Sequence, residues 1–190
     1  QARPQKREYS LNVVSGVTKC RSVHTVDKYI RYLHEAYLVF SIPRFSFKVK
    51  EQAGRNRKIY CVDNGLAASA GFRFSADRGA LYENLVAVAL KKEEIAGRIS
   101  LFSWKSPQHE EVDFVVKEGL QVARLIQVCS DISNPKTLKR EMRALVKASQ
   151  ELHCDELLLL NDRVDRMETF TWQGTERPIR LMPLWSFLNK

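Results

Sequence analysis

The order of apolar patterns after Ser75 constrains the fold of this chain more than any other feature. A helix is predicted first, because Leu81, Leu85 and Val88 recur at helical spacing. Three strand-like runs follow, and then Asn134 is the predicted N-cap of a second long helix. A further strand and a two-strand tail complete the order, so the strand segments are RISLFSW, EEVDFVV, ARLIQVCS, ELLLLND, METFTW and RPIRLMPL. This pattern predicts an α/β fold with a mixed sheet flanked by helices.

Residues 1–65 have a different pattern, and we expect them to form a winged helix-turn-helix module. A short helical candidate, YSLNVV, precedes the longer helix VHTVDKYIRYLHEAYLV, for which Thr25 is the predicted N-cap. The next two segments, VFSIPRFSFKVK and RKIYCVDNG, alternate like strands around the polar turn EQAGRN and predict a hairpin. The chain is therefore expected to have two domains, a winged helix over 1–65 and a sheet domain over 66–190.

The positive charge of the chain is concentrated in the first of these domains. The net charge is +9, and residues 1–65 hold 13 Lys and Arg against 5 Asp and Glu, whereas residues 66–190 hold 18 against 17. Such a local positive field suits DNA or RNA as a partner, although small modules are also often basic because charge keeps them soluble. Phosphate contacts are expected mainly from the hairpin. The candidate nucleic-acid-binding residues are Lys28, Arg31, Arg44, Lys48, Lys50, Arg55, Arg57 and Lys58.

Several kinds of site and location are disfavoured by the sequence. The four cysteines form no Cys-x-x-Cys pair and the four histidines lack i, i+4 spacing, which argues against a disulfide framework and a zinc site. None of the eight glycines is followed by lysine, so no ATP-phosphate loop is expected. No apolar run approaches the roughly 18 residues of a membrane span, and the first residues do not read as a signal peptide. We expect a cytoplasmic protein with reduced thiols and no membrane partner, and a chain that is part of a longer one.

The stretch EEVDFVVKEGLQVARLIQVCSD predicts two neighbouring strands with polar residues on one face. Side chains alternate along a strand, so Asp113 is expected to share a face with Val115, and Gln127 with Cys129. A turn between the strands brings Asp113 opposite Gln127. Glu83, on the preceding helix, is placed to reach the same cleft.

This arrangement resembles the PD-(D/E)xK nuclease superfamily, whose core has the same order of helix, three strands, helix and strand. The resemblance implies a restriction-endonuclease-like fold. In that superfamily a helix Glu, a strand Asp and a following (Asp/Glu)-x-Lys hold Mg²⁺ and activate a water for phosphodiester cleavage. Carboxylate oxygens suit hard divalent cations, and the lysine ammonium stabilises the nucleophile.

A closer resemblance is to the C-terminal region of archaeal and bacterial AAA-type ATP-binding proteins, in which a winged helix and a nuclease-like domain follow the ATPase. The segments that carry it, in the same order, are KIYCVDNGL, GALYENLVAVAL, EVDFVV and LIQVCSDIS with TLKREMRAL. The resemblance implies that this region holds no cofactor of its own. It also implies that ATP binds only to an upstream ATPase domain, which is then a partner of this chain.

The superfamily's functional positions fall on Glu83, Asp113, Gln127 and Cys129 of this sequence. Two of them depart from the pattern, because a glutamine is neutral and a thiol, also neutral at pH 7, does not replace an ammonium. Glu83 and Asp113 remain as a Mg²⁺ site that is weak at most. Either a basic residue from another backbone position restores the lysine, or the two acids are ordinary carboxylates in ion pairs with such residues. The candidates for both roles are Lys105, Lys139, Arg140 and Arg143.

Three functions remain open from the sequence. In the first, the chain is the effector region of an ATPase and binds DNA or a partner through a winged helix and a degenerate nuclease-like domain. In the second, it is an active metal-dependent DNA endonuclease with a migrated lysine. In the third, it is a protein–protein interaction module of a signalling or stress ATPase. Salt dependence separates the first from the third, because phosphate-mediated binding weakens steeply as salt rises.

Overall fold

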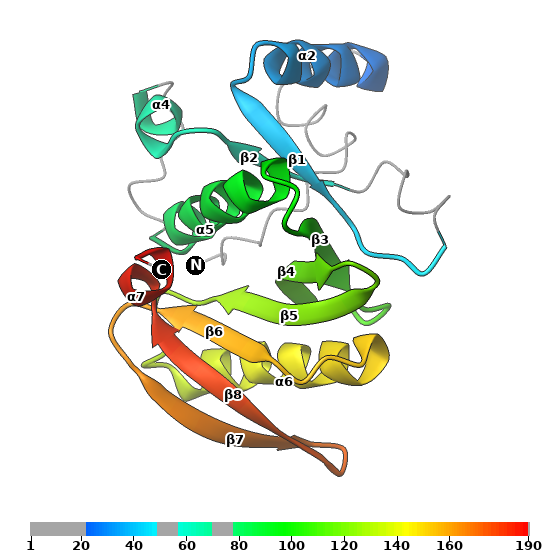
Figure 1. Cartoon of the computed structure of the whole chain (residues 1–190). Helices are drawn as coiled ribbons and strands as arrows, with labels where there is room; N and C mark the ends of the chain where they lie inside the picture. The colour runs from blue at the N-terminus through cyan, green and yellow to red at the C-terminus, as the bar shows by residue number, and fades with distance from the viewer. Residues whose placement is uncertain (1–21, 49–56, 70–77, 190) are drawn as a thin grey trace.

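A six-stranded mixed sheet forms the centre of the computed structural model, which describes residues 22–48, 57–69 and 78–189 (Figure 1). The strands of this sheet are β3 (Ser100–Lys105), β4 (Glu111–Glu118), β5 (Gln121–Val128), β6 (Leu157–Asn161), β7 (Arg166–Trp172) and β8 (Thr175–Pro183). Their order is β3-β4-β5-β6-β8-β7, in which β6 pairs parallel with β5 and β8 and the other pairs are antiparallel. The predicted mixed sheet is thus confirmed.

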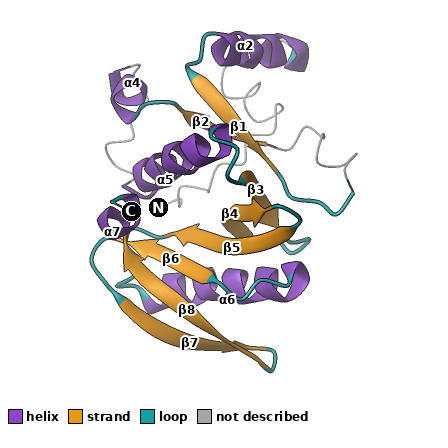
Figure 2. Ribbon diagram, viewed as in Figure 1, coloured by secondary structure: helices purple, strands orange, loops and turns teal. Residues whose placement is uncertain are grey.

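Two long helices cover the two faces of this sheet. Helix α5 (Arg78–Ile95) packs on one face and α6 (Pro135–Leu152) on the other (Figure 2). The N-terminus of α6 is capped as predicted, because Asn134 Oδ1 accepts hydrogen bonds from the backbone N–H groups of Lys136 at 2.9 Å and Thr137 at 3.3 Å. The predicted order of helix, three strands, helix and strand is therefore confirmed.

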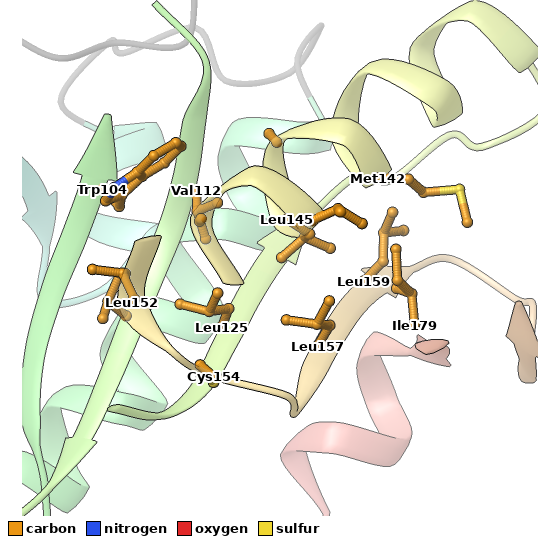
Figure 3. Packing of buried hydrophobic residues seen from close by; sticks show 14 of the residues in the cluster. Trp104, Val112, Leu125, Met142, Leu145, Leu152, Cys154, Leu157, Leu159 and Ile179 are labelled. Atoms are coloured by element: carbon orange, nitrogen blue, oxygen red, sulfur yellow. The ribbon is translucent and has the colours of Figure 1, made fainter. Parts of the chain in front are cut away.

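The apolar core is divided by the sheet into two layers. Leu157 and Leu159 of β6 pack on the α6 side, which Figure 3 shows, whereas Leu158 and Leu160 pack on the α5 side. Every residue of β6 is buried, as expected for a strand that has parallel neighbours and helices on both faces.

Helix α2 (Val23–Glu35) begins earlier than predicted. Its N-cap is Ser22, whose side chain accepts a hydrogen bond from the backbone N–H of His24 at 3.2 Å. Thr25 lies inside the helix, so the predicted cap is wrong. Serine and threonine have the same capping chemistry, and a local pattern locates a helix end only to within a few residues.

The predicted hairpin is present next to this helix. Strands β1 (Val39–Pro43) and β2 (Arg57–Cys61) pair antiparallel. Two short helices that the patterns did not predict are α4 (Asn64–Ser69) and α7 (Leu184–Leu188). The candidate helix YSLNVV lies outside the described residues, so the winged helix stays a prediction. In the described ranges, no helix combines the length and the apolar character needed to cross a membrane.

The hairpin packs directly against the six-stranded sheet and α5. Ile42 and Tyr60 belong to the same buried cluster as Phe114 of β4. Beyond the end of β1, the backbone N–H of Phe45 donates to the carbonyl of Ser103 on β3 at 2.7 Å. The domain boundary at residue 65 stays a prediction, but one continuous apolar cluster crosses it.

Candidate functional site

A β-bulge in β4 lies at the centre of the candidate site. Phe102 of β3 pairs with Val115 of β4, and Trp104 pairs with Val112, so two steps along β3 match three steps along β4. A bulge of this kind breaks the alternation of side chains and re-aims one of them. Asp113 is one of the two residues inside the bulge.

The bulge turns Asp113 and Phe114 toward the same side of the sheet. The Asp113 carboxylate lies 2.7 Å from the Lys58 ammonium, and the Phe114 ring centroid lies 5.8 Å from that of Tyr60, two residues further along β2. Val115 packs on the opposite side, with α6. The predicted face shared by Asp113 and Val115 is therefore wrong, because the alternation rule assumes an unbroken strand.

The backbone pairing of β4 with β5 ends at this point. Hydrogen bonds from side chains to the backbone take the place of the backbone–backbone hydrogen bonds. The paired register runs only as far as Phe114 and Ile126. Beyond it, Asp113 Oδ2 accepts a hydrogen bond from the Val128 N–H at 3.0 Å. Gln127 Oε1 accepts one from the Asp113 N–H, also at 3.0 Å. Asp113 and Gln127 are thus adjacent, as predicted, and both have a structural role in closing the sheet.

Lys58 joins the helix acid to the strand acid. Its ammonium donates to Glu83 Oε1 on α5 at 2.9 Å and to Asp113 Oδ1 at 2.7 Å. The hydroxyl of Tyr60 donates to the same Glu83 oxygen at 2.7 Å. Only 5% of the Lys58 side chain and none of the Asp113 side chain is exposed. Two carboxylates from different elements are therefore held together around one buried cation.

The placement of Lys58 corrects one sequence-based assignment. We predicted that Lys58 contacts phosphates from an exposed surface of the hairpin, but the structure buries it. The cause is the alternation along β2, which turns Lys58 and Tyr60 toward α5 and leaves the side chain of Arg57 exposed. The pattern of β2 predicted that Lys58 and Tyr60 share a face, but nothing local indicated which face α5 covers.

A second polar group continues the network on the α6 side. Gln127 Nε2 donates to Glu141 Oε2 at 2.7 Å, and the guanidinium of Arg140 donates to the other oxygen of Glu141. Glu141 is buried, although nothing in its helical pattern indicated a residue of the site. Hydrogen bonds therefore connect α5 to α6 through the gap between β4 and β5, because Asp113 links Lys58 to Gln127.

Cys129, the position at which the superfamily has its lysine, is on the α6 side of the sheet. It packs in the α6-side cluster, and its thiol donates to the carbonyl of Asp131 at 3.2 Å.

Of the basic residues proposed to restore the lysine, Lys105 pairs with Glu111. The others are Arg140, paired as above, Arg143, which pairs with Glu110 at 2.9 Å, and Lys139, which is exposed. The residue that reaches both Glu83 and Asp113 is instead Lys58.

The two acids do not fit a divalent ion in this arrangement. The Lys58 ammonium occupies the position between Glu83 and Asp113 that a bridging ion requires. Within the three described ranges, His, Cys, Asp and Glu side chains form no group of three or more that is placed to bind a metal. The donor set is therefore that of an ion-pair network rather than of a Mg²⁺ site.

The pKa values of Lys58 and Tyr60 are both raised in the folded chain. Burial by itself lowers the pKa of Lys58, but the charges of Asp113 and Glu83 outweigh it and hold this pKa well above its ordinary value of 10.5. Burial raises the pKa of Tyr60 well above 10.0, and the Glu83 charge adds to the effect. At neutral pH the centre thus contains a charged ammonium and a neutral phenol.

These shifts predict a loss of stability in alkali. A group whose pKa is higher in the folded chain contributes stability that is complete below its unfolded pKa and is lost as the pH rises through its folded pKa. For Lys58 and Tyr60 that loss begins at about pH 10. Urea titrations between neutral pH and strong alkali should show a shallower alkaline decline for Tyr60→Phe than for the wild type. The exposed control Tyr37→Phe should follow the wild type, and equal slopes for all three proteins would contradict the assignment.

Asn84 fixes the end of the hairpin against α5. Its Oδ1 accepts from the Cys61 N–H, and its Nδ2 donates to the Cys61 carbonyl, both at 2.9 Å. The same Nδ2 is 2.8 Å from Oδ1 of Asn64. The buried Asn84 amide thus satisfies the backbone N–H and carbonyl of Cys61, as a neighbouring strand would. It therefore helps to set the position of Lys58, which lies three residues before Cys61.

The other candidate nucleic-acid-binding residues have varied surroundings. Lys28 lies over the ring of Tyr32, with the ammonium 5.6 Å from the ring centroid, and Arg31 pairs with Asp27 at 3.6 Å on the exposed surface of α2. Arg44 is half-buried and donates to the carbonyl of Lys105. The remaining four are Lys48 and Arg57, which are exposed, and Lys50 and Arg55, which lie outside the described residues.

Comparisons with known proteins give relatives but no function. Residues 3–77 match a family model described as a domain of unknown function, DUF8612. An uncharacterized protein of Methanocaldococcus jannaschii is 31% identical over 166 residues, which are 85% of this chain and 35% of that protein. An uncharacterized protein of Haemophilus influenzae is 26% identical over 111 residues, or 58% of this chain and 26% of that protein. The chain thus spans about a third or less of these relatives. No solved structure matches it significantly.

Proposed function

We propose that this chain is a binding region built on a nuclease-like frame that does not cleave DNA. The observation that carries the proposal is the buried contact of the Lys58 ammonium with both Asp113 and Glu83. Both acids are thus paired inside the protein with one cation of the hairpin, Lys58. Asp113 has no exposed surface at which a water or a phosphate can reach it.

The chemistry of phosphodiester cleavage supports the same view. Metal-assisted cleavage requires carboxylates that hold an ion, and an ion that holds a water against the phosphate. Here both oxygens of Asp113 have donors, Lys58 on one and the Val128 N–H on the other. The Gln127 side chain accepts a hydrogen bond from the Asp113 N–H and donates one to Glu141. These groups stabilise the fold, and none of them is presented to a substrate.

From the resemblance to AAA-type ATP-binding proteins, we propose that this chain is an effector region that contacts DNA while an upstream domain binds ATP. The local excess of positive charge in residues 1–65 supports DNA as the partner. Helix α2 and the β1–β2 hairpin have the order expected of a winged helix, and Arg57 and Lys48 are exposed at the hairpin.

An active endonuclease is the second candidate, and one observation favours it. Lys58 reaches both acids from a different backbone position, as a migrated catalytic lysine does. Its burial favours the non-cleaving alternative, because a nucleophilic water needs access to the ammonium.

A cleavage assay decides between these two candidates. We expect no cutting of end-labelled duplex, single-stranded or branched DNA by the purified chain in Mn²⁺. Asp113→Asn is assayed alongside, at a temperature at which circular dichroism shows both proteins folded. Any trace of cutting should be equal in the two proteins, because a contaminant does not depend on Asp113. Cutting by the wild type that Asp113→Asn abolishes would instead establish the endonuclease.

A further inference from the structure

The position of Lys58 suggests what the centre uses in place of a metal. A divalent ion between a helix carboxylate and a strand carboxylate neutralises both charges and holds the two elements together. Lys58 holds the two elements together in the same way, from 2.9 Å and 2.7 Å, but its single positive charge offsets only one of the two negative charges. Because the side chain is tethered to β2, the same contact also attaches the hairpin to α5 and β4.

The oxygens around this cation are already occupied. Asp113 Oδ1 accepts from Lys58 and Oδ2 from the Val128 N–H, and Glu83 Oε1 accepts from both Lys58 and Tyr60. A divalent ion bridging the same acids meets the buried ammonium at contact distance. Like charges this close in a desolvated site repel strongly, so an ion and the ammonium exclude each other.

We propose that the Lys58 ammonium is a built-in replacement for the divalent cation, and that Lys58 and divalent ions compete for Glu83 and Asp113. The proposal rests on the non-cleaving function proposed above and extends it, because it identifies the hairpin as the element that keeps metal out. Metal can then reach the acids only when Lys58 is absent or withdrawn.

The test is the response of thermal unfolding to Mn²⁺ after the ammonium is removed. Lys58→Met keeps the length of the side chain and removes its charge, so two buried carboxylates lose their counter-ion. Its melting temperature should rise in a saturable way with millimolar Mn²⁺ and fall back with EDTA. The wild type should show no such shift. The matched control is Lys58→Met/Asp113→Asn, in which one acid is neutralised and the response to Mn²⁺ should disappear.

The result stays interpretable if Lys58→Met does not fold in EDTA. In that case Mn²⁺ must restore its far-ultraviolet circular dichroism, whereas Na⁺ at equal ionic strength must not. Failure of Mn²⁺ to stabilise or refold Lys58→Met overturns the proposal, as does an equal shift in the wild type. No DNA is present, so this outcome is independent of whether the chain binds or cleaves DNA.

Discussion

Replacing Lys58 with methionine is expected to lower the free energy of unfolding by about 3–5 kcal/mol in metal-free buffer, the usual result of removing one partner from a buried ion pair. The loss is large because Asp113 is fully buried and cannot recover its hydration once the ammonium is gone, whereas Glu83, with 17% of its side chain exposed, recovers only part of its own. Urea denaturation followed by circular dichroism measures the effect.

Two further variants show whether this loss comes from the ion pair. Lys92→Met removes an exposed ammonium from α5 and should change the free energy of unfolding by no more than about 0.5 kcal/mol. Adding Asp113→Asn to Lys58→Met should cost less than the sum of the single changes, because the second substitution removes a charge that the first left unpaired. Additive losses, or a Lys58→Met loss similar to that of Lys92→Met, would argue against a buried charge network.

Reversing four basic residues in and around the hairpin is expected to abolish binding to DNA under the proposed function. The variant replaces Lys48, Lys50, Arg55 and Arg57 with glutamate. It leaves Lys58 unchanged, because that residue is paired inside the protein. Each lost phosphate contact should reduce the slope of log Kobs against log salt by about 0.9, so four contacts reduce it by roughly 3–4. Fluorescence anisotropy with a labelled duplex over a range of salt measures both the affinity and the slope.

A matched reversal separates a local effect from one of total charge. The control replaces Lys92, Lys136, Lys139 and Arg163 with glutamate; all four are exposed and lie outside the hairpin. It changes the net charge by the same amount and should retain most of the affinity. Equal losses in both variants would mean that net charge rather than the hairpin attracts DNA. An affinity that neither salt nor either variant changes would favour a protein partner instead. The exposed Tyr29, Tyr32 and Tyr37 of the α2 region are then the first residues to test.

Much of the sheet domain followed from short-range patterns. The long helices and central strands could be placed because period and capping residues lie within each segment, as at Asn134. The adjacency of Asp113 and Gln127 also followed, since a hairpin turn between two consecutive strands determines which residues are opposed. The short helix α7 was missed because five residues carry too little periodicity.

The orientation of Asp113 did not follow from its own strand. It depends on a bulge, and the bulge exists only because three steps of β4 are matched to two steps of β3. Glu141 was overlooked for a similar reason: in a helical pattern it resembles a solvent-facing acid, and its burial arises from Gln127 on another element.

The sequence by itself determined which segments form the two long helices and the strands of the sheet, and its resemblance to nucleases selected Glu83 and Asp113 as candidate acids and Gln127 and Cys129 as departures from that pattern. Only the tertiary structure decided which cation compensates those acids. Lys58 lies 25 residues from Glu83 and 55 from Asp113 along the chain, and it reaches them because the hairpin folds onto α5. Local periodicity indicates which residues of a strand share a face. The partner that this face meets is set by long-range packing, which places a basic residue of the predicted DNA-binding hairpin inside the core.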